Sequence, residues 1–302
     1  MRITQPGKIT DRIFFLGRTE SCVYLVQGDR EYALVGGGMS YIAPEVSAQI
    51  KKLGVKENLI KRLIILHAHF DHVGCMPYFK KKWPWAVVTG SLRAREMFDT
   101  PKVIETLTTM NRALAAQHGL DREIEEQGLL DFKRLEVEEA VGEGDAISLG
   151  DLSLEVIDAR GHSSCSIAVY APEEKALFAS DAGGIPYGRS PFTVANSNFD
   201  QYQHTLTKMA ALDVEIYLAG HYGAMTGPDA RKYIEETIKA AEETRRLILE
   251  SYARTQDIQK AAQEVARIRL DASPGYFLSE ETVIRTTQQM VKNLVKLMDK
   301  AS

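Results

Sequence analysis

Short apolar runs alternate with turns and helical segments over roughly the first 225 residues of the chain. Each run is rich in Val, Ile, Leu and Tyr and is bounded by Gly, Pro or acidic residues, a pattern typical of β-strands. Several runs are apolar at almost every position, as expected of strands that are covered on both faces. The pattern predicts two sheets with helices outside them, with strands at 21–27, 32–35, 62–66, 85–90, 146–149, 152–158, 166–171, 175–180 and 214–220.

Beyond Gly227 the pattern changes to that of helices. Residues 229–255 and 257–269 have helical composition without strand-like runs, and Ser279 is the predicted N-cap of a last helix that runs to about residue 299. The positions expected on the packed face of that helix are Val283, Thr287, Met290, Val291, Leu294 and Met298.

Another helical stretch, at 97–118, interrupts the strands of the first half. This stretch and the helical tail are both candidate lids over the core. We therefore predict a catalytic domain at 1–226 and a helical extension at 227–302 that covers the active site.

Composition narrows the class of protein. A hydrophobic share of 44% and a charged share of 26% over 302 residues are typical of a globular protein, and a net charge of −4 argues against binding to nucleic acid. No stretch approaches the roughly 20 apolar residues of a membrane helix, and the N-terminus has no apolar signal core. Cys22, Cys75 and Cys165 show no metal or disulfide spacing, which favours reduced, buried thiols in a cytoplasmic protein.

A cluster of polar side chains follows the apolar run at 62–66. The segment HAHFDH provides His67, His69, Asp71 and His72 within six positions. Imidazole nitrogens and carboxylate oxygens together suit zinc and other divalent transition metals, including iron and manganese. A histidine-rich surface loop is the alternative for this segment taken alone.

Three later strands also end on a single histidine or aspartate, at His162, Asp181 and His221. In layered α/β proteins, sites are built where strands end. Four such endings favour a metal centre over a set of unrelated capped strands. His118 and His204 lie in polar helical segments, and we expect solvated or capping roles for both.

In their order and spacing, HAHFDH, the Gly-His pairs at 161–162 and 220–221, and SDA at 180–182 resemble the metallo-β-lactamase superfamily over roughly residues 10–225. The resemblance implies an α/β fold, namely an αββα sandwich with metals at one edge of the β core, here with a C-terminal helical extension. It implies two divalent transition-metal ions (Zn, or Fe or Mn), the first held by His67, His69 and His162, the second held by Asp71, His72 and His221, and the two bridged by Asp181.

Two such ions lower the pKa of a shared water from about 15.7 towards 7 and so supply a hydroxide nucleophile at neutral pH. The implied protein is a metal-dependent hydrolase in which this hydroxide attacks a small-molecule substrate. Asp71 is the expected proton acceptor as the intermediate collapses. Fold and metals alone do not select among ester, thioester, lactone, lactam and phosphodiester bonds.

A narrower likeness concerns the substrate. The stretches ALVGGGMS, HAHFDHVGCMPYF and KVIETLTTMNRALAAQ, with the tail after 229, resemble PqsE-like proteins, which are 2-aminobenzoylacetyl-CoA thioesterases. The likeness implies hydrolysis of an acyl-CoA thioester with a β-keto or aromatic acyl group. In ALVGGGMS, Gly36 stands where many members of the superfamily carry an aspartate that braces the histidine loop.

Contacts to the acyl group are expected from aromatic side chains near the metal motif, after Asp181 and in the tail: Phe70, Tyr187, Phe192 and Phe277. Core packing is the alternative for these aromatics. The run Lys80–Lys82 could meet CoA phosphates or could be a solvated face.

Two other functions remain open at this stage. One is a lactonase, or another ester or phosphodiester hydrolase on the same fold. The other is a signalling or regulatory protein that acts by binding a partner through its helical tail. The amphipathic tail is also a plausible homodimer surface.

Overall fold

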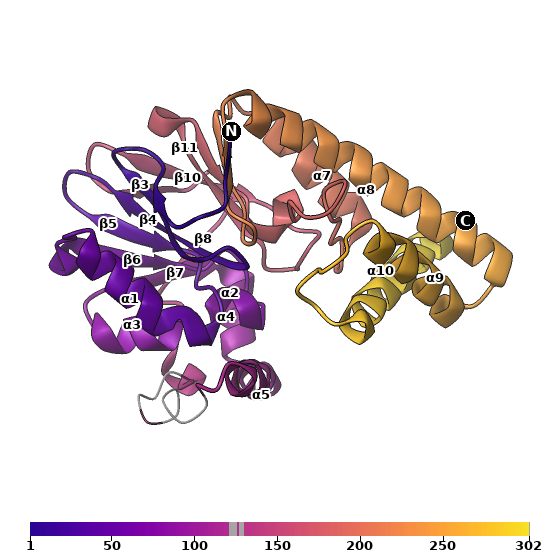
Figure 1. Cartoon of the computed structure of the whole chain (residues 1–302), viewed down its shortest axis with the longest axis horizontal. Coiled ribbons are helices and arrows are strands. Elements are labelled where there is room, and N and C mark those ends of the chain that lie inside the picture. The colour runs from indigo at the N-terminus through magenta and orange to yellow at the C-terminus, as the bar shows by residue number, and fades with distance from the viewer. Residues whose placement is uncertain (121–125, 127–129, 302) are drawn as a thin grey trace.

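The computed structural model describes residues 1–120, 126 and 130–301. In this part of the chain two seven-stranded sheets pack face to face, and helices cover their outer faces (Figure 1). This arrangement confirms the predicted αββα sandwich. A helical region that follows the last strand lies to one side of the sandwich.

Strand β4 (Ser21–Gln27) shows why the central strands are apolar at nearly every position. Successive side chains of a strand point to opposite faces of the sheet. Val23 and Leu25 therefore pack under the outer helices, whereas Tyr24 and Val26 pack between the sheets. Because both faces are covered, no polar alternation is visible in the sequence.

The first sheet is antiparallel from β2 to β5 and parallel from β5 to β8. Its order is β2 (Gly7–Lys8), β3 (Ile13–Arg18), β4, β5 (Tyr32–Val35), β6 (Ile60–Ile64), β7 (Val87–Ser91) and β8 (Glu139–Val141). The parallel strands all send their carboxyl ends to one edge, where the sequence analysis expects the first ligands.

The second sheet contains one parallel pair, β12 with β13, and is otherwise antiparallel. Arg2 pairs with Met225, so the first strand of the chain lies at the sheet edge beside the last. The order is β1 (Arg2–Ile3), β14 (Ala224–Thr226), β13 (Ile216–Leu218), β12 (Ala176–Phe178), β11 (Ile167–Ala171), β10 (Ser153–Asp158) and β9 (Ala146–Ser148).

The helices divide between the two outer faces and the tail. The first sheet is covered by α1 (Ala43–Lys52), α2 (Phe70–Val73), α3 (Met76–Lys82), α4 (Leu92–Phe98) and α5 (Pro101–Gln117). The second is covered by α7 (Phe199–Ala210) and the start of α8 (Pro228–Thr255), and the tail continues with α9 (Ile258–Asp271) and α10 (Glu280–Ala301). Single 3-10 turns lie at η1 (Ser40–Ile42), η2 (Glu57–Leu59), η3 (Phe132–Arg134), η4 (Pro172–Glu174) and η5 (Ser180–Gly183).

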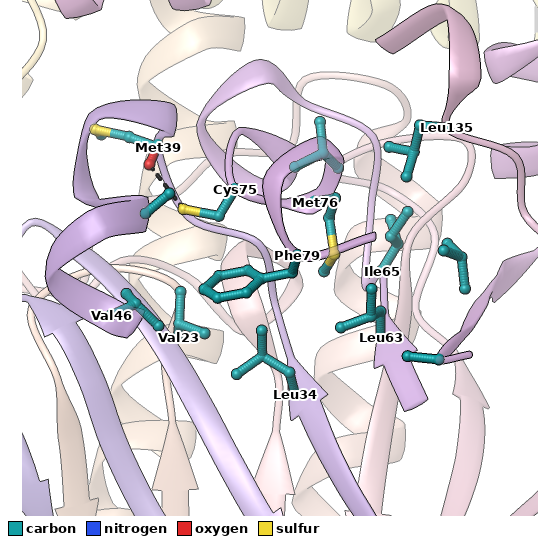
Figure 2. Packing of buried hydrophobic residues seen from close by; sticks show 14 of the residues in the cluster. Val23, Leu34, Met39, Val46, Leu63, Ile65, Cys75, Met76, Phe79 and Leu135 are labelled. Atoms are coloured by element: carbon teal, nitrogen blue, oxygen red, sulfur yellow. Dashed lines mark hydrogen bonds between the residues drawn. The ribbon is translucent and has the colours of Figure 1, made fainter. Parts of the chain in front are cut away.

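The core over the first sheet is centred on α3. Figure 2 shows Phe79 of α3 beside Leu34 of the sheet, with Met76 near Ile65. Phe79 has no exposed surface, and burial of a side chain of this size contributes roughly 1.5–3 kcal/mol. The Cys75 thiol donates to the carbonyl oxygen of Met39 at 3.1 Å, so α3 is also fixed to the glycine-rich turn before α1 (Figure 2).

Helix α8 begins at Pro228, directly after the predicted boundary at residues 226 and 227. Its first turns pack on the second sheet through Tyr233 and Ile234, and its later turns pack on α9 and α10 through Ala241 and Ile248. The tail is therefore attached to the sandwich by one continuous helix (Figure 1).

The last helix agrees with the predicted face except at its end. Ser279 Oγ accepts a hydrogen bond from the Thr282 amide at 3.3 Å, which confirms the N-cap. The predicted face is buried from Val283 to Leu294, but Met298 is 49% exposed. The prediction for Met298 is wrong, because the turn of α10 after Leu294 is only partly covered by the rest of the protein.

All nine predicted strands are found, most of them with small shifts. The strands at 21–27 and 32–35 agree to the residue, whereas the one predicted at 62–66 occupies 60–64. Strand β3, with its apolar run IFFL, was not predicted. All three cysteines are free and buried, as expected. In the described part of the chain, no helix has the length and the apolar run that crossing a bilayer requires.

Candidate metal centre

The first ligand segment begins where the two sheets are joined. After β6, the Ile65 amide donates to the Thr89 carbonyl at 2.8 Å, which prolongs the pairing with β7. The next residue, Leu66, accepts a hydrogen bond from the Ile167 amide of the other sheet, also at 2.8 Å. His67 therefore leaves the sheet at a point fixed from both layers.

The short helix α2, which carries Asp71 and His72, is held by the glycine turn. The Gly37 amide donates to the His72 carbonyl at 2.8 Å, and the Gly74 amide donates to the Gly38 carbonyl at 2.7 Å. A Cβ on Gly37 would lie 2.7 Å from the His72 oxygen, so a side chain there would prevent this approach. The backbone thus braces the histidine loop in a chain that has Gly36 in place of an aspartate.

The other predicted ligands come from the second sheet, at the same edge. His162 follows β10, Asp181 lies in η5 just after β12, and His221 follows β13. The Nε2 atom of His162 is 2.9 Å from Nδ1 of His69. All seven residues that the sequence analysis predicted as ligands are brought together.

Short distances connect the rest of the cluster. Nε2 of His72 is 3.1 Å from Nε2 of His221 and 3.2 Å from Oδ2 of Asp181. Asp181 Oδ2 is also 3.6 Å from Nε2 of His162. The Asp181 carboxylate therefore lies between the His162 side and the His72 side of the cluster.

Burial keeps most of these imidazoles neutral. It lowers the pKa of His67 well below the usual range, with a further contribution from His72, and it lowers the pKa of His69 to about 3. Burial acts in the opposite direction on the carboxyls, but neighbouring histidines outweigh it, so the pKa of Asp71 is about 2 and that of Asp181 is well below its usual range. Neutral imidazoles and ionised carboxylates are the forms that bind metals.

His221 behaves differently. Burial lowers its pKa, but the carboxylates of Asp181 and Asp71 and the Glu20 carbonyl raise it to about 9. This position therefore favours a positive charge, which a metal ion would supply.

The hydrogen bonds of two ring nitrogens test the fit to a metal. Nδ1 of His162 donates to the Val194 carbonyl at 2.8 Å, and Nδ1 of His221 donates to the Glu20 carbonyl at 2.6 Å. In the neutral form of each ring, this bond keeps the proton on Nδ1 and leaves the Nε2 lone pair facing the cluster, as in metal-binding histidines. His67 Nε2 and Asp181 Oδ1 are buried without a hydrogen-bond partner among the described residues, and both fit a ligand role.

Ligand atoms within 4.8 Å of one another form three groups: His67, His69 and His162; His67, His72 and Asp181; and Asp71, His72 and His221. The sequence analysis missed Ser180, whose Oγ lies 3.5 Å from Nδ1 of His67 and 3.4 Å from Nδ1 of His72. In the sequence, only the position of Ser180 directly before Asp181 indicates that it lies at the site. The carbonyls of Val194 and Glu20 have no signal in the sequence, because a backbone group can lie beside any residue type.

A cavity of about 380 Å³ opens from this cluster towards the tail. Its lining includes His69, Asp71, His162, Asp181 and His221 on the metal side, together with the apolar side chains of Phe70, Met110, Ile185, Phe192, Val194, Phe277, Leu278 and Val283. Three of the four predicted substrate contacts, Phe70, Phe192 and Phe277, are among them. Met110 comes from α5 and Val283 from α10, so both predicted lid regions contribute to the wall.

The fourth predicted contact, Tyr187, lies behind that wall. Its ring stacks on Tyr222, with centroids 4.4 Å apart, and its hydroxyl donates to the Pro274 carbonyl at 2.8 Å. It supports the loop that carries Tyr276 and Phe277 and is absent from the described lining.

Lys80 and Lys82 are paired with Glu138 and Glu57 on the surface, and the lining includes neither. His118 and His204 are exposed, and the ring of His118 stacks on Tyr41 with centroids 3.8 Å apart. These four side chains are thus not part of the site.

An αββα sandwich with a buried histidine and aspartate cluster at one edge of its β core is the architecture of a class of metallohydrolases. The sequence profile of the metallo-β-lactamase superfamily matches residues 16–221. The chain belongs to that superfamily, whose fold implies divalent metal ions.

The sequence is similar to those of several hydroxyacylglutathione hydrolases. The one from Bradyrhizobium sp. (strain BTAi1) is 25% identical over 192 residues, 63% of this chain and 59% of the relative. The one from Nitrobacter winogradskyi is 25% identical over 235 residues, 77% of this chain and 69% of the relative. The chain thus spans about three fifths of the length of the first relative.

Solved structures share the fold. A metallo-β-lactamase family protein from Thermus thermophilus has a TM-score of 0.63 at 19% identity and covers 94% of each chain. A metallo-β-lactamase from Elizabethkingia meningoseptica has a TM-score of 0.57 at 19% identity and covers 80% of this chain and 91% of that one.

Proposed function

We propose that the protein is a dinuclear metal-dependent hydrolase that cleaves an acyl-CoA thioester. The observation that carries this proposal is that the predicted ligands form overlapping groups of three beside an apolar cavity, enough for two ions. The first ion would be held by His67, His69 and His162, the second would be held by Asp71, His72 and His221, and Asp181 would bridge the two.

When bound, the ions would supply a hydroxide nucleophile at neutral pH and an electrophile for the developing oxyanion, with zinc, iron and manganese all suited to these ligands. The residues of this chain have to hold that centre and handle the proton. Burial raises the pKa of Asp71, but His72 and His221 lower it to about 2, so the carboxyl is ionised at neutral pH. In this form it can accept the proton of the attacking water and orient that water towards the substrate carbonyl.

The apolar wall supports an acyl substrate. Phe70, Phe192 and Phe277 line the cavity beside the cluster, and aromatic rings favour flat or aromatic acyl groups. A volume of about 380 Å³ lies within the range for small-molecule sites. These features support the aromatic or β-keto acyl group that the PqsE-like resemblance implies.

The opposite wall supports a polar, anionic thiol carrier. Thr282, Arg285, Thr286 and Gln289 line the cavity at the spacing of one helix face of α10. Arg285 is the cation among these four residues and suits the phosphates of CoA. The names of the curated relatives likewise indicate hydrolysis of acylglutathione thioesters, a second class of anionic thiol esters.

The test is a substrate panel run with metal content measured on the same sample. The panel contains an aromatic β-keto acyl-CoA, an aliphatic acyl-CoA, an S-acylglutathione, a lactone and a phosphodiester. We expect free thiol from the acyl-CoA esters and no turnover after the metal is removed by a chelator. Turnover of the lactone or phosphodiester without any thiol release would overturn the thioesterase proposal. Absence of bound transition metal in active protein would overturn the dinuclear centre.

A further inference from the structure

Arg269 of α9 connects the helical tail to the wall of the metal centre. It is only 7% exposed. Its Nη1 donates to Thr287 Oγ1 of α10 at 2.8 Å, and its Nη2 donates to the carbonyl oxygen of Thr193. The guanidinium also lies over the ring of Phe192, 3.9 Å from the centroid. One side chain thus holds two tail helices and the segment at 192–194.

The surroundings of this guanidinium are unusual for an arginine. Burial lowers the pKa of Arg269 to about 10, and Tyr276 and Tyr202 are the ionisable groups that oppose the shift. No carboxylate within the described residues forms an ion pair with it. Burial of an unpaired charge costs free energy that an apolar side chain of similar size would avoid. What the guanidinium adds is a planar set of donors with a fixed direction.

The segment that Arg269 holds also orients a predicted ligand. The Val194 carbonyl, one residue after the Thr193 carbonyl, accepts the hydrogen bond from Nδ1 of His162 at 2.8 Å. That bond fixes the ring and leaves Nε2 free to face His69. The two carbonyls belong to consecutive peptide units that share the Cα of Val194, so displacement of the Thr193 carbonyl also displaces the Val194 carbonyl.

We propose that Arg269 is a positioning residue that sets the orientation and tautomer of His162 through the Thr193–Val194 backbone, and so couples the helical tail to the metal centre. The role of His162 as a ligand rests on the proposed function. The hydrogen bond between His162 and Val194 exists whether or not His162 binds a metal. The positioning role of Arg269 can therefore be tested separately from the proposed function.

The first measurement uses metal-free full-length protein. Nitrogen-15 NMR of the histidine rings reports whether Nδ1 of His162 carries the proton, with the signal identified by its loss in His162→Gln. We expect a protonated, exchange-protected Nδ1 in the wild type and a mixture of tautomers in Arg269→Met. Arg267→Met is the matched control, since Arg267 lies on the same helix, is exposed, and has no hydrogen bond to the 192–194 segment. The same tautomer in Arg269→Met and the wild type would overturn the inference.

The second measurement is metal affinity, by chelator competition on the cobalt-substituted protein with its visible spectrum recorded. We expect Arg269→Met to weaken one of two binding steps by roughly 10–100-fold, the effect typical of losing a residue that orients a metal ligand. The other binding step should be unchanged. A wild-type affinity and spectrum in Arg269→Met would overturn the inference even if kcat fell.

A variant that keeps the positive charge controls for the case in which Arg269→Met does not fold. Arg269→Lys retains a donor but cannot reach both acceptors with a planar fork, so we expect a spectrum and affinity between those of the wild type and Arg269→Met. If Arg269→Met does not fold, Arg269→Lys decides alone, and a wild-type tautomer and spectrum in it would overturn the proposal. A wild-type protein with a protected Nδ1 but no metal would instead overturn the proposed function and leave the positioning role standing.

Discussion

The two ends of the active-site cavity are built in different ways. At the metal end the predicted ligands lie three to eight residues after a strand end, the Gly37 amide donates to the His72 carbonyl, and the Val194 carbonyl accepts from Nδ1 of His162. At the other end the wall is one face of α10, which is held in place by contacts with α9 and the later part of α8. The metal end is therefore built on the sandwich, with Arg269 as its connection to the tail, and the far end depends on the docking of the tail.

This difference separates chemistry from specificity. Substitutions at the metal end should act on kcat, because they alter the groups around the reacting atoms. Substitutions on the cavity face of α10 should act on KM, because they alter only the contacts to the distal part of the substrate. Three substitutions test that division, and the first has the largest expected effect.

Asp181→Ala tests the metal end most directly. The Asp181 side chain is buried, and its Oδ2 lies 3.2 Å from Nε2 of His72 and 3.6 Å from Nε2 of His162. We expect kcat to fall by about 10²–10³-fold or more, the scale of losing one group that stabilises the transition state, together with lower metal content. Steady-state kinetics with metal analysis measure both, and His204→Ala, at an exposed site on α7, is the control. A normal kcat in Asp181→Ala would remove this residue from the centre.

Gly37→Ala tests the backbone brace. The new Cβ would lie 2.7 Å from the His72 carbonyl oxygen and 2.8 Å from Cγ of Met76. We expect the free energy of unfolding to fall by about 1–3 kcal/mol, as in other overpacked cores, with a loss of metal affinity. Denaturant titration measures the first effect, and Gly142→Ala is the matched control because its Cβ would meet no atom within 4 Å. Equal stability of the two variants would show that the turn does not brace the histidine loop.

Arg285→Gln tests the far end. Because this side chain is exposed, its interaction with an anionic substrate should be weak, and we expect KM for an acyl-CoA to rise by no more than about fivefold with kcat unchanged. The increase should shrink at high salt, since screening acts on exposed charges. Arg267→Gln on α9 is the control. A fall in kcat instead of a rise in KM would contradict the division between the two ends.

The same division explains what could be predicted from the sequence. His162, Asp181 and His221 were predicted because each ends an apolar run, and strand ends meet at one edge of a sheet. The polar face of α10 was not recognised, although the N-cap at Ser279 and the buried face from Val283 were. The pattern shows that the helix packs but not what its other side faces.

Arg269 and Tyr187 show the same limit. The sequence favours exposure for an arginine, and only the packing of α9 and α10 over the 192–194 segment buries Arg269. Tyr187 lies on the predicted loop, but its ring turns towards Tyr222 and away from the cavity. Which way a loop side chain points depends on neighbours that are distant in sequence, and no local pattern encodes them.

The pairing of β1 with β14 has a consequence for synthesis of the chain. More than 200 residues separate Arg2 from its partner Met225, so the edge of the second sheet cannot close until nearly the whole sandwich has been translated. At 5–20 residues per second the first strand waits roughly 10–40 s for its partner. During that interval the first sheet, whose strands end at Val141, can form on the ribosome while residues 2 and 3 remain unpaired. Closure of this edge therefore joins a strand to a partner that is translated more than 200 residues later.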